Sequence, residues 1–179
     1  MSIGPTLETE RLILRPPQHQ DFDGFCALMA DAEAARHIGG VQQPPIVWRG
    51  LCTLVGAWTI QGYSMWSVIE KSTGNWIGRL GPWQPEGWPG KEVGWGLLRS
   101  AWGKGYAYEG AVAAMDFVFG VLGWDDVIHT IAPENAASIK LALRLGSPRI
   151  GPTQLPPPFD TVPVDAYGQS AEDWRARTK

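Results

Sequence analysis

The sequence predicts one α/β domain, of the α+β kind, with a mainly antiparallel sheet, over residues 1–179. Three observations predict it. Two amphipathic helical stripes come first, three strand-like segments separated by turns follow, and the remainder alternates strand and helix. A chain of 179 residues is long enough to bury a core without disulfides or a structural metal, and no linker separates two cores.

The N-terminal third predicts a strand and two helices. Residues 11–15 are an apolar run ended by two prolines, which is typical of a strand. A helical region begins near Asp21 and closes at Gly39-Gly40, and a second helix has Pro44-Pro45 in its first turn and ends before Gly62. The inward faces are expected to be Phe22, Phe25, Cys26 and Met29, then Trp48, Leu51, Cys52, Val55 and Trp58.

The middle of the chain predicts an antiparallel meander. Residues 63–70, 76–83 and 92–98 are rich in β-branched and aromatic side chains, and glycine-containing turns separate them. Alternation places Gly94 and Gly96 on the same face of the third strand, so that face is expected to be bare and open to a ligand.

The C-terminal half predicts strand, helix and irregular chain. Residues 106–122 form a largely buried central helix, 126–132 a buried strand, and 135–145 a helix that ends at Gly146. Ile139, Ala142 and Leu143 are expected to face inward. Six prolines from Pro148 onward predict an irregular segment before a last strand near 162–167 and a helix that starts at Ser170.

Composition excludes several classes of protein. The chain is 44% apolar and 18% charged with a net charge of -3, which argues against disorder and against nucleic-acid or membrane partners. Cys26 and Cys52 are too few for a zinc or disulfide framework, so we expect reduced core thiols and no metal. With no signal peptide and no apolar run long enough to span a bilayer, the sequence predicts a cytoplasmic protein.

The most informative segment runs from Leu97 to Glu109, where a strand passes through a glycine-bearing turn into a helix. Backbone N–H groups at a helix N-terminus lack intrahelical partners, so they can hold a pyrophosphate without a basic patch. Gly103 and Gly105 allow close backbone approach. The spacing fits neither the dinucleotide fingerprint nor a P-loop.

This segment resembles a known family. Residues 102–107 followed by Glu109 look like the acyl-CoA pyrophosphate loop of Rim-type enzymes, the ribosomal-protein N-terminal acetyltransferase-like subgroup of the GNAT superfamily. Residues 9–15, 92–95 and 135–138 resemble its first strand, central strand and last conserved helix. The resemblance implies a splayed, mainly antiparallel sheet of six to seven strands, flanked by helices on both faces, with acetyl-CoA between the central strand and the next.

The resemblance also assigns residues to acetyl-CoA. Main-chain groups of Leu97 and Leu98 would bind the pantetheine, the amides from Gly103 to Ala107 the pyrophosphate, and Asn135 and Ser138 would lie near the thioester. The full set is Leu97, Leu98, Trp102, Gly103, Lys104, Gly105, Tyr106, Ala107, Asn135 and Ser138. Gly146-Ser147-Pro148 departs from the usual Gly-Phe of the family, in a region that helps to frame the acceptor site.

Acetyl transfer to an amine needs a neutral amine, stabilisation of an oxyanion and a proton for the departing thiolate. We expect direct attack in a ternary complex. Ser138 is the candidate thiolate donor, or only a first-turn serine. Asn135 is a candidate to orient it, or only an N-cap. Glu92 is the candidate base, or a solvated strand residue.

Other aromatic and histidine side chains are secondary candidates for the site or are expected to be structural. Tyr167 is a secondary candidate near the thioester, and His37 and His129 are expected to be structural histidines. Most tryptophans are expected in the core, Trp102 among them. Trp88 and Phe159 lie in loops, where an exposed aromatic suits either an acceptor groove or an interface in a homodimer.

The acceptor is the least determined partner. A peptide or protein N-terminal amine ranks first, and a small-molecule amine of the aminoglycoside or polyamine type ranks second. A non-catalytic acyl-CoA sensor or interaction module is the rival from another class.

Overall fold

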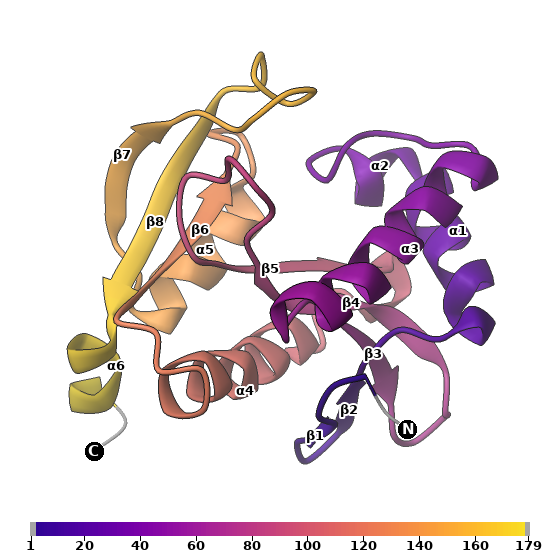
Figure 1. Ribbon diagram of the computed structural model, residues 1–179, viewed down its shortest axis with the longest axis horizontal. Helices are drawn as coiled ribbons and strands as arrows, with labels where there is room; N and C mark the ends of the chain where they lie inside the picture. The colour runs from indigo at the N-terminus through magenta and orange to yellow at the C-terminus, as the bar shows by residue number, and fades with distance from the viewer. Residues whose placement is uncertain (1–2, 178–179) are drawn as a thin grey trace.

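The computed structural model describes residues 3–177, in which one eight-stranded sheet has the order β1-β2-β3-β4-β5-β6-β8-β7 (Figure 1). The strands are β1 (Leu7–Glu8), β2 (Leu12–Arg15), β3 (Trp66–Glu70), β4 (Trp76–Trp83), β5 (Glu92–Leu97), β6 (Asp126–Ile131), β7 (Arg149–Thr153) and β8 (Val164–Ser170). The helices are α1 (Phe22–Ala30), α2 (Ala32–Ala35), α3 (Pro44–Gln61), α4 (Tyr106–Gly120), α5 (Ala136–Leu145) and α6 (Ala171–Arg177).

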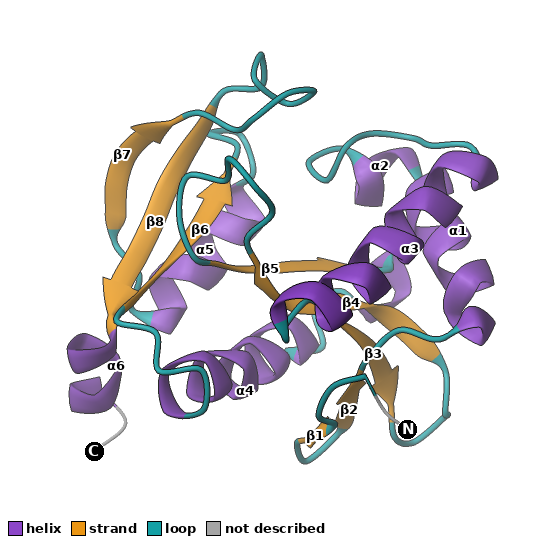
Figure 2. Ribbon diagram, viewed as in Figure 1, coloured by secondary structure: helices purple, strands orange, loops and turns teal. Residues whose placement is uncertain are grey.

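Every neighbouring pair of strands is antiparallel except β5 and β6. These two strands run parallel and pair at one register position, Glu92 opposite Ile128. The two strands then diverge: β5 runs across the middle of the molecule, while β6 runs toward the top of the view (Figure 2). The expected splay of a mainly antiparallel sheet is confirmed, and we call the opening beyond Glu92 and Ile128 the β5–β6 split.

Helices cover both faces of the sheet, as expected. The long helix α4 packs against one face of β2, β4 and β5. Its buried alanines and aromatics join Leu12, Leu80 and Val93 in one core. Helices α1 and α3 lie on the opposite face and form a second core with Leu28, Leu54 and other apolar residues. The edge of β5 at the β5–β6 split therefore lies between two separately packed layers.

Two N-terminal expectations need correction. The first helical region is broken at Asp31, whose carboxylate accepts from the amides of Glu33 and Ala34 and starts α2 as a cap. The second helix buries Val47, Leu51, Leu54 and Trp58. Leu51 and Trp58 are buried as predicted, and the rest of the inward face was predicted one position off, because adjacent helix residues point about 100° apart. Trp48 is 42% exposed and Cys52 is exposed, so Cys52 is not a core thiol, while Cys26 is half-buried.

Two C-terminal expectations are also wrong. The segment expected to be irregular contains β7, which pairs with β8 and adds a strand to the predicted count. Pro152 is tolerated there because β7 is the edge strand of the sheet. In α5, Ala142 is buried as predicted. Leu143, also expected to face inward, is 55% exposed, and Leu145 is buried in its place. No helix within residues 3–177 is both long and apolar enough to cross a membrane.

Candidate functional site

The predicted phosphate loop forms a tight glycine turn at the start of α4. Gly103 and Gly105 have φ of 72° and 82°, a left-handed conformation that side-chain-bearing residues rarely adopt. A Cβ at Gly103 would meet open space, and one at Gly105 would lie 3.4 Å from the Arg11 guanidinium. No side chain of these two glycines therefore covers the first amides of α4, which fits a site for an anion.

Side chains from β1–β2 and from α4 fix the position of this loop. Arg11 donates to the Lys104 carbonyl over 2.9 Å and forms an ion pair of 2.6 Å with Glu109. Glu109 also accepts from Thr9 Oγ1 over 2.5 Å, so the α4 carboxylate ties the helix to the turn between β1 and β2. Tyr106 donates its hydroxyl to Glu70 over 2.5 Å. The Glu109 of the sequence motif therefore supports the loop from behind.

The strand before the loop presents only part of its main chain. Leu98 N–H donates to the Ile77 carbonyl over 2.9 Å, and the Leu97 carbonyl accepts from Trp102 Nε1 over 2.9 Å. In an antiparallel ladder alternate residues turn their polar groups to opposite sides, so the Leu97 N–H and both groups of Trp95 point toward the split. Trp102, expected in the core, is 47% exposed.

The face of β5 that carries Gly94 and Gly96 is not bare. A Cβ at Gly94 would lie 2.8 Å from the Met65 methyl group, and one at Gly96 would lie 3.2 Å from Ile38. The prediction that a ligand lies over Gly94 and Gly96 is wrong, because Met65 and Ile38 of the second core fill the space above these two glycines. The glycines let those side chains pack against the strand, and the open edge of β5 lies at the split.

Side chains replace main-chain pairing where the split begins. Ile128 N–H donates to the Lys91 carbonyl over 2.8 Å, and the next bond of a regular parallel ladder would join Thr130 N–H to the Val93 carbonyl. Thr130 N–H donates to Glu92 Oε1 over 3.2 Å, and the Val93 carbonyl lies 2.6 Å from His129 Nδ1. One side chain from each strand thus bonds the main chain of the other.

Glu92 is enclosed at this point of the sheet. It is 6% exposed and accepts from Trp88 Nε1 over 2.5 Å, from Thr130 N–H and from Thr130 Oγ1 over 2.9 Å. Burial raises the pKa of Glu92 from 4.5 to about 7, although these hydrogen bonds and Arg79 oppose the rise. The reading of Glu92 as a solvated strand residue is wrong. Trp88, expected to be exposed, is half-buried against it.

Ser138 and Asn135 meet the other side of the split. Asn135 is the N-cap of α5 and accepts from Ser138 N–H over 3.2 Å. The Ser138 hydroxyl oxygen accepts from Trp95 Nε1 over 3.1 Å. Because the indole can only donate, this contact leaves the hydroxyl hydrogen of Ser138 free to donate elsewhere. Sequence reasoning placed Trp95 in the core and did not connect it with Ser138.

His129 is a structural histidine, as expected. Gln169 Nε2 donates to Ser147 Oγ over 2.8 Å, and that hydroxyl lies 3.0 Å from His129 Nε2. Because a carbonyl oxygen can only accept, Nδ1 carries the proton and donates to the Val93 carbonyl, and Nε2 accepts from the Ser147 hydroxyl. Burial lowers the pKa of His129 to about 4, against the rise caused by the Val93 bond. Ser147, where the sequence departs from the family pattern, completes this buried network.

The remaining candidates surround the site without joining it. Tyr167 is buried with Ile131 and Ala142, beside Trp95. His37 Nδ1 lies 3.8 Å from Glu134. The half-buried Phe159 approaches Gly39, to 3.7 Å from the position of a Cβ there. The proline-rich segment between β7 and β8 therefore leans toward the α2–α3 connection.

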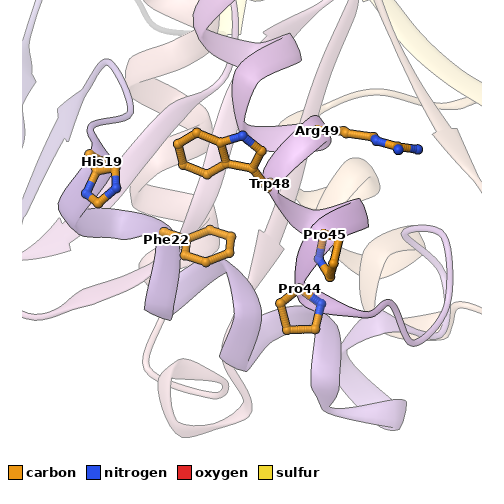
Figure 3. A pocket seen from close by; sticks show the side chains of 6 residues that line it. All are labelled: His19, Phe22, Pro44, Pro45, Trp48 and Arg49. Carbon is orange, nitrogen blue, oxygen red and sulfur yellow. The ribbon is translucent and has the colours of Figure 1, made fainter.

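Two surface hollows lie outside the split. An apolar one of about 590 Å³ lies between the starts of α1 and α3, and none of the residues assigned to acetyl-CoA lines it (Figure 3). Its lining is His19, Phe22, Pro44, Pro45, Trp48 and Arg49. A second, of about 440 Å³, adjoins the phosphate loop. Its lining includes Glu70, Leu98, Ser100, Lys104 and Tyr106.

Comparisons with known proteins agree with this geometry. The family model described as an acetyltransferase (GNAT) domain matches residues 11–147. An uncharacterised N-acetyltransferase, p20 of Bacillus licheniformis, is 31% identical over 139 residues, 76% of this chain and 78% of that protein. An acetyltransferase from Agrobacterium tumefaciens superimposes with a TM-score of 0.80 at 32% identity, over 92% and 94% of the two chains.

A more distant structure shares the fold alone. The ribosomal-protein-S5-alanine acetyltransferase of Vibrio fischeri superimposes with a TM-score of 0.68 at 18% identity, over 95% of this chain and 98% of that one. The family match covers the phosphate loop, β5, the split and the start of α5, which are the elements that form the candidate site. The chain belongs to the GNAT acetyltransferase family.

Proposed function

We propose that this protein transfers the acetyl group of acetyl-CoA to a primary amine, a peptide or protein N-terminus, by direct attack in a ternary complex. One observation carries the proposal: Glu92 and Trp95 lie on opposite faces of β5, and Trp95 holds Ser138 beside the same split. A carboxylate suited to accept a proton and a hydroxyl suited to donate one therefore lie on the two sides of one strand edge.

The residues present fit acetyl-CoA. The amides from Gly103 to Ala107 would hold the pyrophosphate, with Lys104 and Trp102 beside it, because the helix N-terminus favours negative charge. The Leu97 N–H and the main chain of Trp95, which point toward the split, would bind the amide groups of the pantetheine. Trp95 takes the place expected of Leu98, whose N–H donates to Ile77 and whose carbonyl accepts from Ala101. Acetyl-CoA supplies the thioester that carries the acetyl group.

Glu92 would accept the proton of the amine. With a pKa of about 7, its carboxyl group is partly ionised at neutral pH and can take up a proton directly or through a water molecule. The donors Trp88 and Thr130 hold the carboxylate in one place. Ser138 would donate to the departing thiolate, since Trp95 already occupies its oxygen as an acceptor and leaves its proton available.

The choice of a peptide N-terminus rests on the Rim-type pattern of residues 102–107 and Glu109. The Vibrio fischeri enzyme, named for acetylating an alanine of a ribosomal protein, supports it only as a protein of the same fold. Small-molecule amines and a binding role without turnover remain the alternatives that the experiment must separate.

The test is release of CoA from acetyl-CoA with defined amines. Peptides with free N-termini should release CoA, while the same peptides with acetylated N-termini should not, which makes each peptide its own control. Faster CoA release with a polyamine or an aminoglycoside than with any peptide would identify a small-molecule amine as the acceptor instead of a peptide N-terminus. Binding of acetyl-CoA in calorimetry without CoA release from any amine would instead support the sensor reading.

A further inference from the structure

Within residues 3–177, Arg79 is a half-buried cation for which no ion pair with a carboxylate is found. Arg79 is on β4, opposite Gly96 of β5 and on the same face as Trp83. Trp83 lies opposite Glu92, so the cation and the candidate base share one face of the sheet. This is the face covered by α1 and α3, on the opposite side from α4.

The guanidinium of Arg79 makes one hydrogen bond among residues 3–177, to the Met65 sulfur over 3.7 Å. A thioether is a weak acceptor. No described carboxylate lies within ion-pair distance of it, whereas the more exposed Arg11, Arg99 and Arg149 each pair with a carboxylate over 2.6 to 2.7 Å. Nearly all N–H donors of Arg79 therefore have no partner in the part of the chain that the structure describes.

Arg79 is half-buried, and a guanidinium that is partly removed from water without gaining an acceptor loses hydration that no hydrogen bond replaces. Burial lowers the pKa of Arg79, and the Glu92 carboxylate opposes that change, so the two charges act on each other through the protein. Glu92 spends its own oxygens on Trp88 and Thr130 and makes no hydrogen bond with Arg79. A planar fork of N–H donors is suited to a carboxylate or a carbonyl oxygen.

We propose that Arg79 is a specificity-determining residue that binds the carboxylate or first carbonyl oxygen of an α-amino acid unit, while Glu92 receives the proton of its amine. The inference rests on the proposed acetyl transfer and narrows its acceptor. Free amino acids and peptide N-termini share this chemistry. Polyamines and aminoglycosides would bring a second positive charge to Arg79, and like charges at close range are repelled.

Two aromatic residues beside Glu92 fit such an acceptor. Trp83 and Trp88 lie edge to face, with ring centres 6.4 Å apart, next to Glu92. Indole faces attract an ammonium group, so they favour the amine end near Glu92 and leave the oxygen end for Arg79. The arrangement orients an α-amino acid unit by its two charged or polar ends.

The test compares wild type with Arg79→Met, which keeps a long apolar stem, Arg79→Lys, and Arg49→Met, an equal charge change on the exposed part of α3. Acceptors are amino acids, peptides with the same N-terminal residues, the matching decarboxylated amines, spermidine and kanamycin. We expect amino acids or peptides to be the best acceptors. Arg79→Met should lower their kcat/KM about 10- to 100-fold, mainly through KM, with acetyl-CoA affinity unchanged.

The controls separate a binding role from a structural one. Arg79→Lys should retain part of the activity and Arg49→Met all of it. Because Arg79→Met removes an unpaired, half-buried charge, its melting temperature should equal or exceed that of wild type. A melting temperature several degrees lower would assign Arg79 to structure and overturn the inference. So would an equal loss on decarboxylated amines, or preference for spermidine or kanamycin.

Two remaining outcomes are distinct. The ratio of activity on free amino acids to activity on peptides identifies which source supplies the α-amino acid unit, and either answer supports the inference. If acetyl-CoA binds and no amine in any set releases CoA, the proposed function itself fails, and the acceptor role of Arg79 fails with it.

Discussion

Glu92 and His129 exchange main-chain partners across the split: Glu92 of β5 accepts the N–H of Thr130 on β6, and His129 of β6 bonds the carbonyl of Val93 on β5. Side chains thus satisfy the two groups that a regular ladder would have paired. Both are enclosed, and their pKa values move in opposite directions, which makes the split a source of opposite pH effects on stability.

Glu92 should make the fold less stable as the pH rises from mildly acidic to neutral. Its folded pKa of about 7 exceeds the ordinary value of 4.5, so the folded state binds the proton more tightly, and stability falls as pH rises from 4.5 to 7. The loss is about 3 kcal/mol at 1.36 kcal/mol per pKa unit. Denaturant unfolding of Glu92→Gln should therefore show the variant gaining about that much on wild type between pH 4.5 and 8. A constant difference across this range would contradict the assignment.

His129 should act in the opposite direction. Because its folded pKa of about 4 lies below 6.5, the unfolded state takes up the proton first, and stability falls as pH drops from 6.5 to 4. The loss is again about 3 kcal/mol. His129→Phe keeps a ring beside Trp95 but leaves the Val93 carbonyl unpartnered. It should be less stable at pH 7 by about 1 to 3 kcal/mol and should lose this acid dependence, measured by chemical unfolding.

The rate of acetyl transfer should rise with pH through the ionisation of Glu92. If Glu92 receives the amine proton, kcat/KM increases toward a plateau above a pKa near 7. Glu92→Gln should remove this limb and lower the rate by about 100-fold or more. Steady-state assays from pH 5.5 to 9 would check it. An identical limb in the variant would show that another group titrates.

Ser138 should affect turnover and not the binding of acetyl-CoA. Ser138→Ala removes the candidate proton donor but keeps the amide that Asn135 caps, so the fold should persist. We expect kcat to fall about 100-fold with an unchanged Kd for acetyl-CoA. Trp95→Phe keeps a ring against His129, whose centre is 4.9 Å from that of the indole, and should give a smaller loss. Weaker acetyl-CoA binding in Ser138→Ala would point to a structural role.

The glycine loop should be intolerant of side chains for a specific reason. Gly105→Glu places a negative charge beside the first amides of α4 and should weaken acetyl-CoA binding at least 100-fold in calorimetry. Gly123→Glu is the matched control, since Gly123 also has a positive φ, of 66°, and open space around it, but lies beyond the other end of α4. Both variants carry similar backbone strain. Equal binding in the two would remove the loop from the site.

The sequence predicted the parts of the site that are contiguous in the chain. The glycine turn before α4, the meander of β3, β4 and β5, and the Asn135 cap of α5 all follow from short-range patterns. Helix faces were less secure, since Trp48 and Leu143 lie next to the buried stripe and a rotation of one residue exchanges core for solvent.

The tertiary structure decided which distant residues meet. Glu92 and Thr130, Trp95 and Ser138, and Arg79 and Glu92 are brought together by strand register and by the early end of the β5–β6 pairing. A one-residue slip would turn each of these strand side chains to the other face. The sequence alone thus determined the family's loop and the order of most elements, without β7 and α2. Three-dimensional register, fixed by packing of both cores, decided the enclosure of Glu92, the partner of the Ser138 hydroxyl and the position of Arg79 away from any carboxylate.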